Sequence, residues 1–143
     1  MNNRSDRLTR GLRWLALVTM IVAGSAALTG SDPGQHANKT VIVRMRDDMR
    51  FYPESVTIAP GDTIVWINEG AMPHTATDKP GTAALEEHNV LPPGAEPFDS
   101  GLLQSGERFQ HVFTVAGDYA YLCFLHEGLG MVGHVKVGGG LGM

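Results

Sequence analysis

One stretch of the sequence decides how the whole chain is interpreted: Tyr121-Leu122-Cys123-Phe124-Leu125-His126-Glu127-Gly128-Leu129-Gly130-Met131. It contains the only cysteine among 143 residues, then a histidine after two intervening residues, and a methionine after four more. Tyr119 to Cys123 has the composition of a strand that ends at the thiol, and the glycines that follow indicate a loop. Thiol, imidazole and thioether groups therefore lie in one short loop.

This combination of donors predicts a copper site. Thiolate and thioether ligands favour Cu(I) and imidazole suits Cu(II), so a site with all three can hold either oxidation state. Such a site needs a second histidine, and the candidate is His74, between two strand-like runs. Taken singly, Cys123, His126 and Met131 would each be structural more often than not. Their shared loop, in a chain with no second cysteine for a disulfide, favours metal ligation.

Two other histidines have simpler interpretations. His88 follows Glu86 and Glu87, which could suggest a second metal site, but a solvated acidic turn explains this cluster better. His111 shares one face of a predicted strand with Phe109 and Phe113 by the two-residue period of a strand. We therefore interpret His111 as a core or edge histidine and leave it out of the site.

The N-terminal residues predict export. Four arginines between residues 4 and 13 precede an apolar run from Trp14 to Ala27 that ends in small residues. This is the pattern of a secretory signal peptide, which we assign to residues 1–30. A retained membrane anchor is the alternative, although the apolar run is short for a transmembrane helix. We expect the mature protein in the periplasm or another extracytoplasmic part of the cell envelope, with no stable membrane insertion.

The charge of the mature chain argues against nucleic acid as a partner. Removal of residues 1–30 takes four arginines and Asp6 from 11 basic and 15 acidic residues, which leaves 7 against 14 and a formal charge of −7. These charges are scattered and form no basic patch, as nucleic-acid binding would require. An acidic surface would attract a basic patch on a partner protein, although ordinary solubility explains the charge equally well.

The remaining residues predict one all-β domain. Runs rich in β-branched and aromatic residues predict these strands: Thr40–Met45, Phe51–Ile58, Thr63–Asn68, one starting at Thr75–Thr77, Arg108–Val115, Tyr119–Cys123 and Val132–Val137. Seven or eight short strands with turns at roughly ten-residue spacing are typical of a Greek-key β-sandwich. We assign this domain to residues 40–137, flanked by a flexible mature N-terminus (31–39) and a flexible glycine-rich tail (138–143).

The sandwich architecture would assemble the site. Loops of a sandwich cluster at its two ends, so His74 and the Cys123–Met131 loop can meet at one end between rigid strands. The least readable segment is 78–98, a long loop rich in proline and glycine, in which residues 83–88 could form one or two helical turns. Trp66, in the most apolar strand, is expected in the core.

These residues resemble the cupredoxins, the small blue copper proteins such as plastocyanin, pseudoazurin and amicyanin. The resemblance covers residues 40–137 and rests on these motifs: Phe51-Tyr52-Pro53, Pro60 to Asn68, Pro73-His74-Thr75, Asp99-Ser100-Gly101, Gly117-Asp118-Tyr119, and Cys123-x2-His126-x4-Met131 followed by Val132-Gly133. It implies a cupredoxin-like fold holding one type 1 copper ion.

The resemblance also implies roles for individual residues. His74, Cys123 and His126 would be near-trigonal ligands and Met131 a weak axial ligand. Thr75 and Phe124 occupy positions where the family supplies hydrogen bonds to the sulfur, and plastocyanins commonly carry asparagine where this chain has Thr75. The implied function is transfer of single electrons between redox proteins.

We expect a monomeric carrier whose donor and acceptor proteins dock transiently near His126. An apolar surface around that histidine would come from Ala71, Met72, Pro73, Leu125, Leu129 and Gly130. A protein that stores or delivers copper with the same ligands is the alternative. Enzymatic activity is not expected, because the sequence contains only one complete ligand set and copper enzymes with such domains need further copper sites.

Overall fold

The computed structural model describes residues 37–138. Its elements are β1 (Thr40–Arg46), β2 (Arg50–Tyr52), β3 (Ser55–Ile58), β4 (Thr63–Asn68), the 3-10 helix η1 (Glu86–His88), β5 (Arg108–Val112), β6 (Gly117–Leu122), the 3-10 helix η2 (Glu127–Leu129) and β7 (Val132–Val137). The predicted signal peptide (1–30), most of the predicted flexible N-terminus and most of the glycine-rich tail lie outside the described residues. Between residues 37 and 138, no helix is long and apolar enough to cross a membrane.

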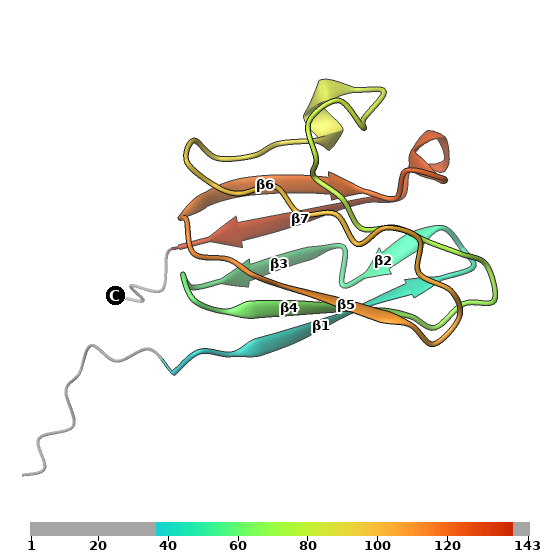
Figure 1. Ribbon diagram of the computed structural model, residues 1–143, viewed down its shortest axis with the longest axis horizontal. Coiled ribbons are helices and arrows are strands. Elements are labelled where there is room, and N and C mark those ends of the chain that lie inside the picture. Colours follow the sequence, from blue (N-terminus) through green and yellow to red (C-terminus); the bar gives the residue numbers. More distant parts are fainter. Residues whose placement is uncertain (1–36, 139–143) are drawn as a thin grey trace, which may run out of the picture. The chain divides into compact units, whose positions relative to one another are not determined.

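The strands form two sheets that pack face to face (Figure 1). One sheet has the order β2-β1-β4-β5 and the other the order β3-β7-β6. The pairs β1/β4 and β3/β7 are parallel, and the pairs β1/β2, β4/β5 and β6/β7 are antiparallel. The prediction of an all-β sandwich of seven to eight strands is confirmed, with seven strands in the described part of the chain.

Alternating burial explains why these strands pack as a sandwich. Along β4 the side chains of Ile64, Trp66 and Asn68 are buried, and the residues between them are only partly buried. The predicted interior position of Trp66 is confirmed. On β7, His134 is exposed between buried neighbours. Each sheet therefore presents one apolar face to the other.

The core is built around aromatic rings from both sheets. The ring centroid of Trp66, on β4, lies 5.3 Å from that of Tyr121, on β6, in an edge-on arrangement. Phe98, which comes from the long connection, lies 4.9 Å from Trp66, and Phe51 lies 4.7 Å from Tyr121. Such pairs contribute about 0.5–1.5 kcal/mol each beyond the burial of their area. Tyr121 is two residues from Cys123, so this cluster forms a rigid base for the thiol.

The predicted strand Phe51–Ile58 is wrong as a single element. It is divided into β2 and β3, which belong to different sheets. The division falls at Pro53, which cannot donate a ladder hydrogen bond and has a restricted backbone. The chain crosses from one sheet to the other there. The apolar alternation continues on both sides, so it could not reveal the change of partner.

The prediction of a strand starting at Thr75–Thr77 is also wrong, because no strand forms there. His74 pairs with Leu103 through reciprocal hydrogen bonds of 3.1 and 2.8 Å, whereas Thr77 forms isolated bridges with Asp99 and Leu122. The backbone changes partner between these residues, so no continuous ladder forms. The segment nevertheless pairs with residues 99–103 on one side and with Leu122 of β6 on the other, and these pairings hold His74 in place.

The long segment 78–98 covers the open edge of the second sheet. Val90 and Ala120 exchange two backbone hydrogen bonds of 3.1 and 3.0 Å, so the segment pairs with the edge strand β6. Figure 1 shows the segment rising above β6, with the single helical turn η1 at its crest. The expectation of one or two helical turns in residues 83–88 is met by this one turn. Edge strands are commonly protected by such a covering loop.

Asp78, at the base of this segment, should make stability depend on pH. Its side chain is fully buried, and burial raises the pKa of the carboxyl to about 7, although the Phe98 N–H donates a 2.6 Å hydrogen bond to it. An unfolded aspartate ionises near pH 4. Between about pH 4 and 7 the folded protein therefore holds a proton that the unfolded chain has lost, and the free energy of unfolding falls as the pH rises, by up to about 4 kcal/mol.

The variant Asp78→Asn, which cannot ionise, should lack this part of the pH dependence. We expect the difference in unfolding free energy between variant and wild type to change steadily between about pH 4 and 7 and to level off above that range. Urea denaturation of the metal-free proteins measures it. The lowered pKa values of His74 and His111 also make stability depend on pH, but they do so equally in both proteins and cancel in the difference. Parallel profiles for the two proteins would contradict the prediction.

Candidate metal centre

The loop that carries His74 is shaped by a buried amide. Asn68 ends β4 with a fully buried side chain, whose Nδ2 donates to the carbonyls of Met72 (2.8 Å) and Leu103 (3.0 Å). Its Oδ1 accepts a 2.9 Å hydrogen bond from the Gly70 N–H. Both Nδ2 and Oδ1 of this amide are hydrogen-bonded to the backbone. This fixes the path of the chain, because breaking either contact would leave a buried polar group unpaired. Asn68 therefore determines where the loop leaves the sheet.

A carboxylate holds the same loop from outside. Asp47 accepts hydrogen bonds from the N–H groups of Ala71 (3.0 Å) and Met72 (2.9 Å). These bonds hold the pKa of the Asp47 carboxyl below its ordinary value. A Cβ atom at Gly70 would overlap the Asp47 carboxylate, so this position requires glycine. Asn68 and Asp47 together therefore fix the path of the loop that positions His74.

The Cys123–Met131 loop closes on itself. The Cys123 N–H donates to the Met131 carbonyl (3.0 Å), and the Met131 N–H donates to the His126 carbonyl (3.3 Å). The His126 N–H in turn donates to the Cys123 carbonyl (3.0 Å). Gly130 ends η2 in the left-handed conformation, with φ of 82°, which glycine adopts without strain. These bonds bring the backbone of Met131 beside that of Cys123, although the two residues are far apart along the loop.

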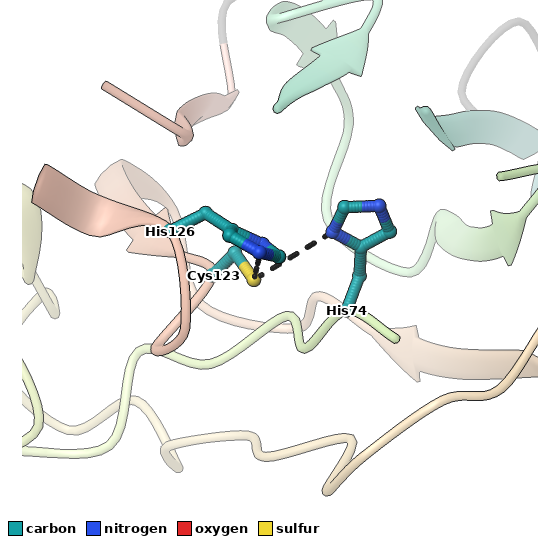
Figure 2. Close-up of side chains that lie close together, drawn as sticks. All are labelled: His74, Cys123 and His126. Carbon is teal, nitrogen blue, oxygen red and sulfur yellow. Dashed lines mark hydrogen bonds between the residues drawn. The ribbon is translucent and has the colours of Figure 1, made fainter. Parts of the chain in front are cut away.

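Three donors from the two loops converge. The sulfur of Cys123 lies 3.9 Å from Nδ1 of His74 and 3.4 Å from Nδ1 of His126 (Figure 2). One ligand atom from each of the three residues lies within 4.8 Å of the others, and all three side chains are buried. Metal–nitrogen and metal–thiolate bonds of about 2.0–2.3 Å, set in a triangle, would separate the donors by about 3.5–3.8 Å. The observed separations fit one metal ion.

The environment favours the metal-binding protonation state of the first histidine. Burial, and then the neighbouring His126, lower the pKa of His74 below its ordinary value. Its imidazole is therefore neutral near pH 7 and keeps a lone pair for a metal, as ligation requires. His74 is fully buried, whereas His126 keeps 9% of its exposure. His126 is thus the more accessible of the two rings.

The thiol of Cys123 receives a hydrogen bond from the other loop. The Thr75 N–H donates to Sγ over 3.3 Å. Phe124 was expected to contribute a second such bond, but its N–H donates to the Thr75 hydroxyl instead, over 2.7 Å. Thr75 therefore acts twice, because its backbone supports the sulfur and its side chain ties the two loops together. Threonine can do both because its hydroxyl accepts a hydrogen bond as an asparagine carbonyl would.

The remaining predicted and excluded residues have clear positions. Met131 is fully buried and belongs to the same core cluster as Cys123. Among the histidines outside the site, His111 packs against Phe98 with ring centroids 4.9 Å apart. His88 contacts Glu127, and in the described residues it joins no group of metal donors. The interpretation of His88 as part of a second metal site is therefore not supported.

Sequence reasoning missed three supporting residues, Asn68, Asp47 and Glu127. Asp47 and Glu127 accept hydrogen bonds from backbone amides of segments distant in the sequence, and Asn68 joins its own loop to Leu103, so no local pattern reveals the whole set. Asn68 did carry a signal, since it is a polar residue at a core-facing position of an alternating strand. A buried amide there must find hydrogen bonds, and the following loop is the nearest source.

Comparisons with known proteins agree with this geometry. A family model described as copper binding proteins, plastocyanin/azurin family, matches residues 38–138. The plastocyanin of Synechococcus sp. (strain JA-2-3B'a(2-13)) is 33% identical over 135 residues, covering 87% of this chain and 91% of the relative. The chloroplastic plastocyanin of Tetradesmus obliquus is 35% identical over 91 residues, covering 61% of this chain and 57% of the relative.

Solved structures of cupredoxins also resemble this chain. A reduced amicyanin variant superposes with a TM-score of 0.54 at 26% identity, covering 69% of this chain and 82% of its own. A purple cupredoxin from Nitrosopumilus maritimus also gives 0.54 at 26% identity, covering 68% of this chain and 99% of its own. The fold, the convergent thiol and imidazoles, and the family match lead to one assignment. The chain belongs to the plastocyanin/azurin family of copper-binding proteins.

Proposed function

We propose that the protein is a type 1 copper protein that carries single electrons between redox partners. The observation that supports this most strongly is the buried group of one thiol and two imidazoles at the meeting point of two loops. In the proposed site His74, Cys123 and His126 are the near-trigonal ligands, and Met131 is the weak axial ligand. When bound, the copper ion would supply the one-electron change between Cu(I) and Cu(II).

The chain would contribute preorganisation. Asn68 and Asp47 hold the His74 loop, and Thr75 joins it to the Cys123 loop. These hydrogen bonds fix the two ligand-bearing loops, so the ligands would need to move little when copper changes oxidation state. Whether such a geometry is imposed by the protein or is intrinsic to copper–thiolate bonding is debated. Either way, electron transfer is fast when little geometry changes.

Exposed apolar side chains beside the two histidines support transient docking. Leu125 and Leu129 flank His126 in sequence, and Met72 precedes His74; their exposed fractions are 47%, 67% and 41%. Phe124, which we had not included in the predicted apolar surface, is 61% exposed. Apolar patches of this kind suit weak, short-lived complexes with redox proteins. We propose that donor and acceptor proteins dock here, close to the accessible edge of His126.

We further propose that the mature protein is exported to the periplasm or cell envelope, that it acts as a monomer, and that it has no enzymatic activity. Storage or delivery of copper remains the second candidate, because it would use the same donors. The two functions differ in how readily the copper leaves. An electron carrier must keep its copper through many cycles, whereas a delivery protein must release it to an acceptor.

Repeated redox cycling distinguishes these functions. The copper-loaded protein would be reduced with ascorbate, reoxidised with ferricyanide, and analysed for copper after each of several cycles on a desalting column. A carrier should keep its full copper content and its absorption spectrum throughout. Loss of copper at the first reduction, or rapid transfer to a metal-free acceptor protein, would favour delivery instead.

A further inference from the structure

The residue after His126 makes an unusual set of contacts. The carboxylate of Glu127 accepts hydrogen bonds from the Ala84 N–H (2.8 and 3.0 Å to its two oxygens) and from the Leu85 N–H (3.2 Å). It also lies 2.8 Å from Nδ1 of His88. All three partners belong to the 78–98 segment, 39 to 43 residues earlier in the chain. The Glu127 side chain of the Cys123–Met131 loop therefore contacts several polar groups of the 78–98 segment.

These contacts do not resemble those of an ordinary surface glutamate. The side chain of Glu127 keeps only 10% of its exposure, and that of His88 keeps 24%. An ionised carboxylate has about four acceptor positions, and hydrogen bonds to it are about twice as strong as those between neutral groups. By contrast, Glu86 and Glu87, on the same segment, are exposed. Solubility does not require the partly buried arrangement of Glu127.

The position of Glu127 in the loop gives these contacts their significance. The backbone hydrogen bonds of the Cys123–Met131 loop join Cys123, His126 and Met131 to one another. The 78–98 segment is itself attached to β6 through Val90 and Ala120. Glu127 therefore connects the part of the loop that carries His126 to a segment that is fixed on the sheet. Without it, this part of the loop would be held by its internal bonds and by the hydrogen bond from the Phe124 N–H to Thr75.

We propose that Glu127 is a positioning residue that fastens the His126 side of the metal loop to residues 84–88, and that this fastening slows the release of copper. The inference rests on the proposed function, because it assumes that His126 is a ligand. Copper can leave only when a ligand moves away, and His126 is the ligand nearest the surface. Holding its loop in place closes that route, which suits a carrier and not a delivery protein.

The fastening is tested first without metal. Amide hydrogen exchange, followed by NMR in the metal-free protein, would compare wild type with Glu127→Ala. The amides of Ala84 and Leu85 should exchange at least about tenfold faster in the variant, because the loss of a charge-assisted hydrogen bond is worth about a factor of ten or more. The amide of Val90, which donates to Ala120, should keep its protection.

The effect on copper is tested with the Cu(I) protein. A high-affinity Cu(I) chelator is added in excess, and the rate at which its complex forms is measured. Glu127→Ala should release copper about five- to fiftyfold faster than wild type. His88→Ala, which removes one partner from the other side and leaves the metal loop unchanged, should show a smaller increase of about two- to fivefold. This second variant also keeps the test decisive if Glu127→Ala folds poorly.

Glu86→Ala is the matched control. It removes the same charge from an exposed position of the 78–98 segment, so it should release copper at the wild-type rate. Equal acceleration in Glu86→Ala and Glu127→Ala would overturn the proposal, because it would point to charge alone. Wild-type release rates in both Glu127→Ala and His88→Ala would also overturn it, as would unchanged exchange at Ala84 and Leu85. If the wild-type protein instead shows no thiolate–copper absorption, the proposed function fails, and the metal-free exchange experiment still tests the fastening.

Discussion

Replacing Cys123 with serine should abolish the intense visible absorption of the copper-loaded protein. That absorption arises when electron density moves from a bound thiolate to Cu(II), and a serine hydroxyl cannot supply it. Copper affinity should fall by about 100-fold or more, since the loss of a residue that merely supports a ligand already costs up to about 100-fold. Absorption spectroscopy and a competitive copper titration measure the two effects.

The serine variant should still fold. Cys123 is fully buried, but the Thr75 N–H and the His126 ring lie within reach of its side-chain atom. A serine hydroxyl would therefore find hydrogen-bond partners in place of the thiol. Circular dichroism of the metal-free variant checks this. His134→Ala, a change at an exposed histidine outside the site, is the control and should keep both the absorption and the affinity. An intense thiolate-type band in the folded serine variant would disprove the ligand assignment.

Changing Met131 should alter the reduction potential while the protein keeps its copper. Met131→Gln would offer a harder oxygen donor, which favours Cu(II) and should lower the potential. Met131→Leu would leave the metal with one ligand fewer, which costs Cu(II) more than Cu(I), and should raise the potential. A tenfold change in the relative affinity for the two oxidation states corresponds to about 59 mV for one electron. We therefore expect shifts of about 60 mV or more, in opposite directions, measured by voltammetry.

The leucine variant separates this effect from a loss of structure. Met131 is fully buried in the core cluster, and a methionine-to-leucine change conserves volume, so it should cost less than about 1.5 kcal/mol of stability. Met72→Leu is the matched control, because Met72 is a methionine of the His74 loop whose side chain is exposed and only its backbone takes part in the hydrogen bonds of the loop. It should leave the potential near the wild-type value. Potentials that stay the same in both Met131 variants, or copper loss in both, would contradict the axial role.

The sequence predicted the metal centre well because its signals are local. The spacing of Cys123, His126 and Met131 lies within one loop, and thiol, imidazole and thioether together suit few metals other than copper. His74 was harder to select, because it lies 49 residues from Cys123. Its place between two predicted strands made it the best candidate, and the folded chain brings its ring to 3.9 Å from the sulfur. Ligation of copper by these residues stays a prediction.

The fold was predictable in class but not in its connections. The apolar, β-branched run Thr63–Asn68 correctly indicated a strand with Trp66 in the core. The same signal joined β2 and β3 into one strand, because both have an inward apolar side and only their partners differ. Pro53 indicated an interruption but not a change of sheet. Strand pairing is set by contacts distant in sequence, which local composition does not encode.

The supporting hydrogen bonds of the site were the hardest to predict. Thr75, Asp47 and Glu127 all act through backbone amides, and every residue other than proline offers one. Asp47 reaches Ala71 across 24 residues, and Glu127 reaches Ala84 across 43. Which amide a carboxylate meets depends on the folded path of the chain. The type of residue at either position could not reveal these pairs.

Visible absorption and EPR of the mature protein, titrated with Cu(II) and then reduced with ascorbate, test the central claim most directly. We predict one equivalent of copper, an intense charge-transfer band and narrow copper hyperfine splitting, with the band bleached by reduction and restored by reoxidation. This result would establish a redox-cycling copper–thiolate centre. Weak absorption with the wide splitting of tetragonal Cu(II) would mean that Cys123 is not a ligand, and would contradict the proposed electron carrier.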